Sequence, residues 1–330
     1  MKKENLKKEL EAIKKEVEKL CTDNDKVEIQ KIEKNNGVIQ YGMMIRNENK
    51  SVIPLIYLNP YLMEIRKGKP IEEIAKLIYH IYQNDKKLDS VTASECLNVN
   101  LVKDKIIYQL ISLEKNEEKL RNMPHRIIGE DLAVIFSVLL EKNNQAMMST
   151  KISRNFVNHW GIKEEELWEL ADKNTPKLLP VKMERLTDVL IDLMKAQIEK
   201  SGIKLDEEAW NNLLDTHKKQ MNEQVESPMY VLSNQYKIWG ASTILYPGVL
   251  KAAAKQLDGD LIILPSSIHE VILVRKEMIL DYDTMAEMVK EINQKEVLEE
   301  EVLSDSVYLY CRQDDSFRRI SGSKTGYLEE

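Results

Sequence analysis

The stretch Pro265–Val271 contains the residue types most able to do chemistry. Ser266 and Ser267 supply hydroxyls, His269 an imidazole, and Glu270 a carboxylate. A serine nucleophile, an imidazole base and an orienting carboxylate are the parts of the relay in serine hydrolases, where they lie within hydrogen-bond reach of one another. One hypothesis is therefore a hydrolase-like enzyme with a catalytic site near Ser266, Ser267, His269 and Glu270.

The same residues also suit a purely structural turn. Adjacent residues on a strand point to opposite faces, which separates His269 from Glu270, and no GxSxG nucleophile elbow surrounds either serine. Pro265 would end a strand, and Ser266 or Ser267 would then cap a single turn by bonding a nearby backbone amide. This structural interpretation explains the residues better, and under it the protein has no catalytic residues.

Other chemistries lack a sequence signal. The chain has neither GxxxxGK[ST] nor GxGxxG, and its three cysteines form no CxxC pair. No histidine is followed by a second one at helical spacing. We therefore expect no metal, no cofactor and no disulfide framework. The five histidines are scattered along the chain: His80, His125, His159, His217 and His269.

Composition limits the possible partners. The 330 residues are 43% hydrophobic and carry 55 acidic against 48 basic side chains, a formal net charge of -7. Binding to a nucleic-acid backbone needs a concentrated positive face, so no nucleic-acid partner is expected. The first residues lack a continuous apolar segment, and no run of about 18 apolar residues occurs anywhere. These features predict a cytoplasmic protein without membrane association.

The candidate residues lie within the most interpretable part of the chain, residues 228–275. It predicts strand, strand, helix, strand, a tight polar turn and strand. The helix is expected to open at Pro247, whose fixed φ suits a first helical turn, and to stop at Asp258 and Gly259. Short apolar runs at 261–264 and 271–274 form the last two strands.

The N-terminal part predicts a helix, a hairpin and a helical pair. Apolar residues from Leu6 to Leu20 form a heptad-like stripe, which favours packing onto the helix's own domain over a coiled coil. Asn36-Gly37 indicates a hairpin between strands at 27–32 and 38–45. A third strand at 52–58 is expected at a sheet edge because it contains Pro54.

The middle part predicts strands at 106–113, 126–128 and 132–140, with a short edge strand at 146–149. Thr150 is the expected N-cap of a helix that ends at Gly161. A second helix, residues 163–173, is expected to end at Asn174-Thr175-Pro176.

The C-terminal part predicts helices at 186–198 and 205–224, and a further helix capped by Asp283. Val307 to Cys311 alternates as a strand. The residues from Gln313 are expected to form a tail that is poorly ordered past Ile320.

This order of elements predicts an α+β fold, with mostly antiparallel sheets, helices packed on them, and loosely repeated strand-strand-helix modules. The expected parts are an N-terminal module (1–85), a middle module (86–180), a helical connector (181–226), a C-terminal module (227–320) and a flexible tail (321–330).

Four stretches carry a resemblance to a known family. They are WGASTILYPGVL at 239–250, ILPSSIHEVIL at 263–273, LSDSVYLY at 303–310 and DLAVIFSVLL at 131–140. Together they resemble an uncharacterised bacterial family of domains of unknown function, DUF5688. The resemblance covers most of the chain but implies no reaction, cofactor or site residue.

Two functional hypotheses follow. The favoured one is a non-catalytic cytoplasmic binding or assembly protein, whose sheet edges or helix faces contact a protein partner or a second copy of the chain. The alternative is the hydrolase-like enzyme with its site near Ser266, His269 and Glu270. They differ on whether His269 lies within reach of a serine or carboxylate and beside a pocket.

Overall fold

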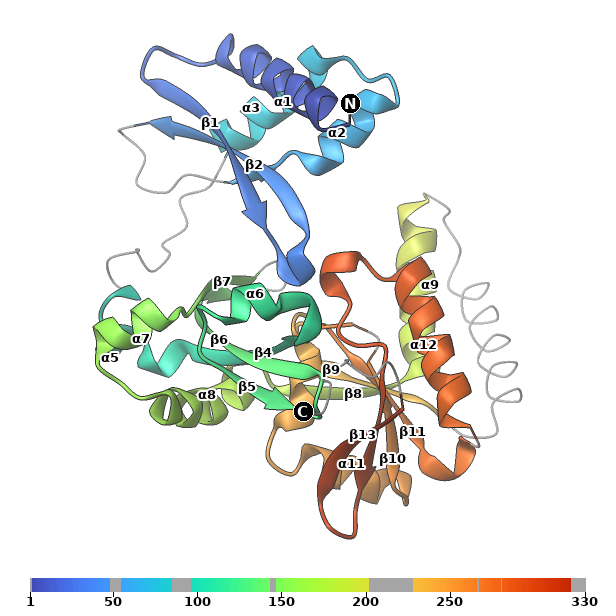
Figure 1. Ribbon diagram of the computed structural model, residues 1–330. Coiled ribbons are helices and arrows are strands. Elements are labelled where there is room, and N and C mark those ends of the chain that lie inside the picture. The colour runs from blue at the N-terminus through green and yellow to red at the C-terminus, as the bar shows by residue number, and fades with distance from the viewer. Residues whose placement is uncertain are drawn as a thin grey trace, which may run out of the picture. The chain divides into compact units, whose positions relative to one another are not determined.

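The computed structural model describes residues 2–47, 55–84, 96–142, 147–201, 228–265, 267–279 and 281–321. Contacts divide the chain into two compact units, Met1–Ser90 and Val91–Glu330. Within the described ranges the fold is α+β, with antiparallel sheets and helices packed on them (Figure 1), as the sequence predicts. No helix in these ranges is both long and apolar enough to span a membrane.

The first unit follows the sequence prediction closely. The hairpin of β1 and β2 pairs Asp25 with Asn47, and its turn holds Asn36 at φ 57. The short β3 pairs with β2 alone among the described strands, which places it at a sheet edge. The elements are α1 (Lys2–Glu18), β1 (Asp25–Glu33), η1 (Asn35–Gly37), β2 (Ile39–Asn47), β3 (Ile56–Tyr57), α2 (Asn59–Arg66) and α3 (Ile71–Asn84).

The stripe on α1 packs inside this unit. Leu10, Ile13 and Val17 are buried in one cluster with Met43 of β2 and Ile78 of α3. Burial of these side chains against their own sheet and helix accounts for the heptad-like spacing without a partner helix.

The second unit begins with a four-stranded sheet. Its central strand β6 pairs with β4 along one edge and with β5 and β7 along the other. The elements are α5 (Val99–Val102), η2 (Lys103–Lys105), β4 (Ile106–Ser112), η3 (Glu114–Asn116), α6 (Glu117–Leu120), β5 (His125–Ile128), β6 (Leu132–Lys142) and β7 (Met147–Lys151).

A six-stranded antiparallel sheet follows, in the order β13-β12-β10-β11-β9-β8. Its two edge strands are not predicted from the sequence, because β8 lies in the expected helical connector and β13 in the expected tail. Both are short and rich in polar residues, which weakens the period-2 signal. The strands are β8 (Val181–Arg185), β9 (Tyr230–Asn234), β10 (Leu261–Leu264), β11 (Val271–Arg275), β12 (Val307–Cys311) and β13 (Ser316–Ser321).

Two helix boundaries in the middle part differ from the prediction. Thr150 pairs with Val138 as part of β7, so Ser153 is the N-cap of α7 (Arg154–Trp160). Helix α8 (Glu164–Leu178) continues through Asn174-Thr175-Pro176.

Tertiary contacts explain why α8 does not stop at these residues. Asn174 Nδ2 donates to Lys103 O and Ile106 O, and Thr175 Oγ1 accepts from Tyr108 N at 3.1 Å. These polar side chains bind the neighbouring strand segment instead of ending the helix.

Further differences lie in the C-terminal part. Residues Gly240–Leu245 form the 3₁₀ segment η4 where a strand is predicted, and the N-cap of α12 (Tyr282–Glu296) is Asp281 rather than Asp283. The predicted helix at 205–224 lies outside the described residues. The remaining elements are α9 (Leu186–Lys200), α11 (Val249–Leu257), η5 (Lys276–Met278) and η6 (Glu299–Glu301).

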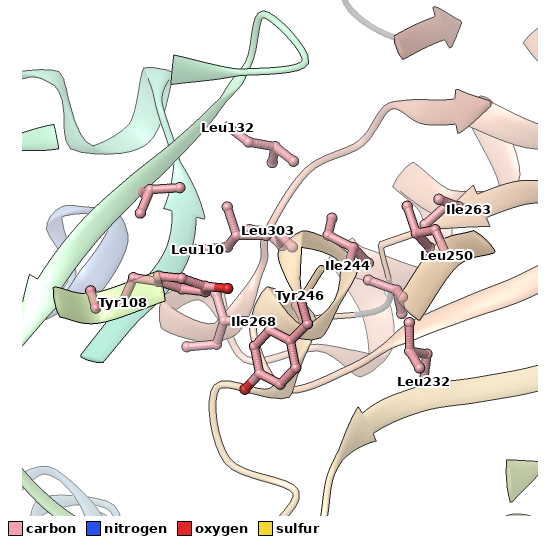
Figure 2. Packing of buried hydrophobic residues seen from close by; sticks show 14 of the residues in the cluster. Tyr108, Leu110, Leu132, Leu232, Ile244, Tyr246, Leu250, Ile263, Ile268 and Leu303 are labelled. Carbon is pink, nitrogen blue, oxygen red and sulfur yellow. The ribbon is translucent and has the colours of Figure 1, made fainter. Parts of the chain in front are cut away.

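One core joins the two sheets of the second unit. Figure 2 shows Tyr108 and Leu110 of β4 with Ile244 and Tyr246 of the η4 region, Leu250 of α11 and Leu303. The predicted middle and C-terminal modules therefore share buried side chains. Their exact boundaries stay a prediction.

Candidate functional site

The turn from Ser267 to Glu270, called the 267–270 turn below, connects β10 to β11. Ser266 lies outside the described residues. Ser267 is buried, and its backbone amide donates to Glu270 O at 3.2 Å. Its Oγ accepts from the backbone amide of His269 at 3.0 Å. The Ser267 hydroxyl is thus bound to the backbone of the turn, as expected for a capping serine.

Both ring nitrogens of His269 have partners. Nδ1 accepts from the backbone N–H of Trp239 at 3.2 Å, and Nε2 faces Glu301 Oε1 at 3.3 Å. Because a backbone N–H can only donate, Nδ1 carries the lone pair and the proton of the neutral ring lies on Nε2, directed at the carboxylate. The imidazole has no free lone pair to take a proton from a hydroxyl.

The carboxylate beside His269 is Glu301, and not its neighbour Glu270. Glu301 ends a run of three glutamates, a pattern typical of a solvated segment, yet Ile268 N donates to Glu301 O at 2.8 Å and holds this residue against the turn. The Glu301 side chain stays about one-third exposed, at 35%. No sequence signal pairs two residues from separate loops in this way.

The 267–270 turn also fixes the backbone around Trp239 and Gly240. Trp239 adopts a left-handed conformation at φ 55, which is rare for a bulky residue. A Cβ on Gly240 would lie 2.1 Å from Ser233 Oγ and 2.5 Å from His269 O. Ser233 Oγ donates to that same carbonyl at 2.7 Å. His269 thus holds the Trp239 backbone through its ring and meets Ser233 through its carbonyl.

A buried carboxylate that the sequence analysis missed lies between the two sheets. Asp131, 9% exposed, accepts hydrogen bonds from three hydroxyls: Ser304 Oγ at 2.7 Å, Ser306 Oγ at 2.8 Å and Tyr308 OH at 2.8 Å. Burial, together with the nearby Asp131 carboxylate, raises the pKa of Tyr308 well above its usual range, so this hydroxyl remains a donor. We call these four residues the Asp131 network.

The Asp131 network joins two of the stretches that carry the family resemblance, 131–140 and 303–310. The other two, 239–250 and 263–273, meet through His269 and Trp239. A backbone bond from Ala241 N to Ile268 O also joins these two stretches, and Ile268 N donates to Glu301 O, two residues before the 303–310 stretch. The four stretches that carry the resemblance therefore take part in two sets of polar contacts.

A third polar cluster contains Lys151 at the end of β7. Its Nζ donates to Gln109 Oε1 and lies 5.5 Å from the centre of the Trp239 ring. Burial, and to a lesser extent the charge of Lys119, lowers the pKa of Lys151 to about 7. A strongly shifted pKa is a common mark of a functional group, and nothing in the sequence of β7 indicates it.

A depression of about 200 Å³ at the end of α9 is lined by Met194, Gln197, Ile198 and Ser201. Among the described residues, no group of three or more His, Cys, Asp and Glu side chains is placed to hold a metal ion.

A family model described as "Family of unknown function (DUF5688)" matches residues 7–312. Neither a curated protein nor a solved structure matches the chain. The matched range includes the 267–270 turn, the Asp131 network and Lys151.

Proposed function

The chain belongs to the DUF5688 family of unknown function, and on that premise we propose that it is a non-catalytic binding or assembly protein of the bacterial cytoplasm. Its expected interaction is with a protein partner or with a second copy of the chain. The three cysteines are free, which is compatible with a reducing compartment.

The observation that carries the proposal is the state of His269. A serine relay needs a hydroxyl at a ring nitrogen, with the other nitrogen oriented by an acid. Here Nδ1 accepts from the backbone of Trp239 and Nε2 faces Glu301, while the Ser267 hydroxyl binds the turn's own backbone. These contacts support a turn that holds loops in place: Glu301 lies within reach of the ring, as an orienting acid would, but no serine hydroxyl of the described residues donates to the ring, and Ser266 lies outside those residues.

Substitution of His269 separates the two hypotheses. We expect His269→Ala to lower the free energy of unfolding by about 1–2 kcal/mol, because the Trp239 amide and the Glu301 carboxylate lose a partner. In His269→Asn the side-chain oxygen takes the place of Nδ1, so about half of the loss should be recovered. Chemical denaturation, followed by tryptophan fluorescence, measures both.

The exposed His159 on α7 provides the matched control, since His159→Ala should change stability by less than about 0.5 kcal/mol. The hydrolase hypothesis would be supported instead if a substrate screen found an activity of the wild type that both His269 variants lose while they remain folded. Substitution of a histidine with a purely structural role would not remove an activity from a chain that remains folded.

The surface of α12 supports the binding part of the proposal. The sheet covers only part of the apolar stripe on this helix. Val289 is buried at 7% exposure, whereas Met288 and Ile292, one turn apart, remain 50% and 46% exposed. Exposed apolar side chains at i and i+4 on a helix suit a helix-mediated protein contact.

We expect Met288→Glu and Ile292→Glu each to abolish capture of the partner or self-association, without unfolding the chain. Gln294→Glu, an exposed change of the same charge on the same helix, should leave both intact. Light scattering after size exclusion detects self-association, and affinity capture from the native cell with quantitative mass spectrometry detects a partner. The interface would be refuted if the wild-type chain is monomeric and captures the same proteins as the Met288→Glu and Ile292→Glu variants.

A further inference from the structure

The long strand β1 forms one edge of the three-stranded sheet in the first unit. Within the described part of the chain, β1 pairs with β2 alone, along Asp25–Glu33 and without a register shift. Its nine residues contain neither proline nor glycine. Natural proteins usually protect such an edge by shortening it, by interrupting it with a proline or a bulge, or by covering it. A regular edge of this length is therefore suited to pairing with another strand.

The hydrogen bonds of β2 show which residues of β1 direct their backbone groups to the outer edge. The Tyr41 carbonyl accepts from Leu58 N at 2.7 Å, so the backbone groups of Tyr41 point away from β1. Lys31 lies opposite Tyr41 in the register and therefore points its own backbone groups to the outer edge. Alternation gives Val27 and Ile29 the same direction. No described residue binds the outward backbone groups of these three residues.

The side chains on the helix-covered face of β1 form a self-complementary pattern. On this face Val27 is 4% exposed and Ile29 is partly buried, both in the cluster that contains α1 and α3 residues. Asp25 lies on the same face, since its Oδ1 accepts from Tyr82 OH of α3 at 2.8 Å, and Lys31 follows by alternation. In chain order the four side chains of β1 are acidic, apolar, apolar and basic. The reversed order therefore offers an apolar partner to each apolar residue and an opposite charge to each charged one.

We infer that β1 pairs with β1 of a second copy of the chain, antiparallel about a two-fold axis through Glu28. This isologous contact places Asp25 opposite Lys31 of the second copy, and Val27 opposite Ile29. The hydrogen-bonded pairs are then formed by residues with outward backbone groups, as an antiparallel ladder requires. Lys31, which has no ion-pair partner within the described residues, gains an opposite charge. The two sheets become one continuous sheet with both sets of helices on the same side.

The other face of β1 tolerates this register. Glu28 meets Glu28 of the second copy across the axis, and two directly opposed carboxylates repel each other. Each of them is held by two cations of its own chain, because Glu28 Oε1 lies 2.9 Å from Lys26 Nζ and Oε2 accepts from Arg46 Nε at 2.9 Å. These ion pairs offset the repulsion. The uncharged Gln30 lies opposite Lys26 of the second copy.

This inference rests on the proposed binding function and deepens it by naming a second copy as one partner. It uses a surface of the first unit and not the α12 face of the second unit, so the two contacts can fail separately. We expect Met288→Glu on α12 to remain dimeric. If self-association is instead lost in Met288→Glu and kept in Lys31→Pro, the β1 contact is overturned and the α12 face is supported.

Two cysteine variants of the full chain test the register. Opposed residues that are not hydrogen-bonded across an antiparallel pair have Cα atoms about 4.5 Å apart, which a disulfide can bridge. Under mild oxidation, Glu28→Cys should therefore form an intermolecular disulfide. Gln30→Cys should not, because its two thiols would lie about 13 Å apart along the strands. Peptide mass spectrometry distinguishes these bonds from any formed by the three native cysteines.

Proline variants provide the second measurement, size exclusion with light scattering over a series of concentrations. We expect a dimeric wild type and a monomeric Lys31→Pro with unchanged circular dichroism, because proline removes an outward N–H that the second copy needs. Glu33→Pro is the matched control, since its N–H also points outward but lies beyond the paired residues 25–31, and it should remain dimeric. Lys31→Glu should weaken the dimer by about tenfold, because it reverses the charge in two symmetric pairs.

The inference is overturned if the wild type is monomeric, if Lys31→Pro remains a dimer, if Glu33→Pro dissociates as Lys31→Pro does, or if Gln30→Cys cross-links as readily as Glu28→Cys. Should Lys31→Pro fail to fold, Lys31→Glu and the cysteine pair decide. A monomeric chain that captures another protein, and loses it in Lys31→Glu, would also overturn the inference, since β1 would then bind a different partner.

Discussion

Asp131→Ala is expected to lower the free energy of unfolding by about 3–5 kcal/mol. The change removes the acceptor of three buried hydroxyls, on Ser304, Ser306 and Tyr308, and each unsatisfied group costs about 1–3 kcal/mol, with partial relief by rotation of the hydroxyls. All four tryptophans belong to residues 91–330, so urea denaturation followed by tryptophan fluorescence reports on the affected unit.

Two further variants make the Asp131 result specific. Asp131→Asn keeps one side-chain carbonyl oxygen as an acceptor and should lose about half as much stability as Asp131→Ala. Asp104→Ala, at an exposed carboxylate, should stay within about 0.5 kcal/mol of the wild type. If Asp131→Ala unfolds at the same urea concentration as the wild type, the network does not connect the two sheets energetically.

Gly240→Ala should cost about 3 kcal/mol or more. The added Cβ would lie 2.1 Å from Ser233 Oγ, 2.5 Å from His269 O and 2.7 Å from Asn234 N. Two of these atoms are backbone, so rotation of a side chain cannot relieve the overlap, and such overpacking costs about 1–3 kcal/mol and in some cases more. Thermal or chemical denaturation measures the loss.

Gly248→Ala separates steric overlap from backbone strain. Gly248 has φ 76 but open space around its Cβ position, so alanine there should cost only about 1 kcal/mol. The double change Gly240→Ala with Ser233→Ala removes the shortest contact and should remain destabilised. Equal losses at Gly240 and Gly248 would show that crowding around His269 does not limit this position.

Local patterns predict most elements of this protein correctly. Asn36-Gly37 predicts the first hairpin, where both residues have positive φ, the apolar spacing from Leu6 to Leu20 predicts α1, and alternation at 307–311 predicts β12. These signals succeed because turn geometry and periodicity involve residues within a few positions of each other. The edge strands β8 and β13 lack such a signal, since their polar residues face solvent and their pairing partners are elsewhere in the chain.

Where local chemistry competes with long-range contacts, the contacts prevail. Asn174-Thr175-Pro176 predicts the end of a helix, yet its polar side chains bind Lys103, Ile106 and Tyr108, and α8 continues through it. Thr150 predicts a cap but pairs in a strand with Val138. In each case tertiary hydrogen bonds give the polar group a partner that the sequence neighbourhood does not contain.

The sequence alone identifies the Ser267–His269 turn as the place where hydroxyl, imidazole and carboxylate meet, and the hydrogen bonds within the turn are local enough to be anticipated. It does not reveal that Glu301 is the acid at His269, that Asp131 collects three hydroxyls from residues more than 170 positions away, or that Lys151 lies beside Gln109 and Trp239. These groups come together only when two sheets pack on a shared core, because burial brings distant segments within hydrogen-bond reach and removes the water that would otherwise keep the lysine charged.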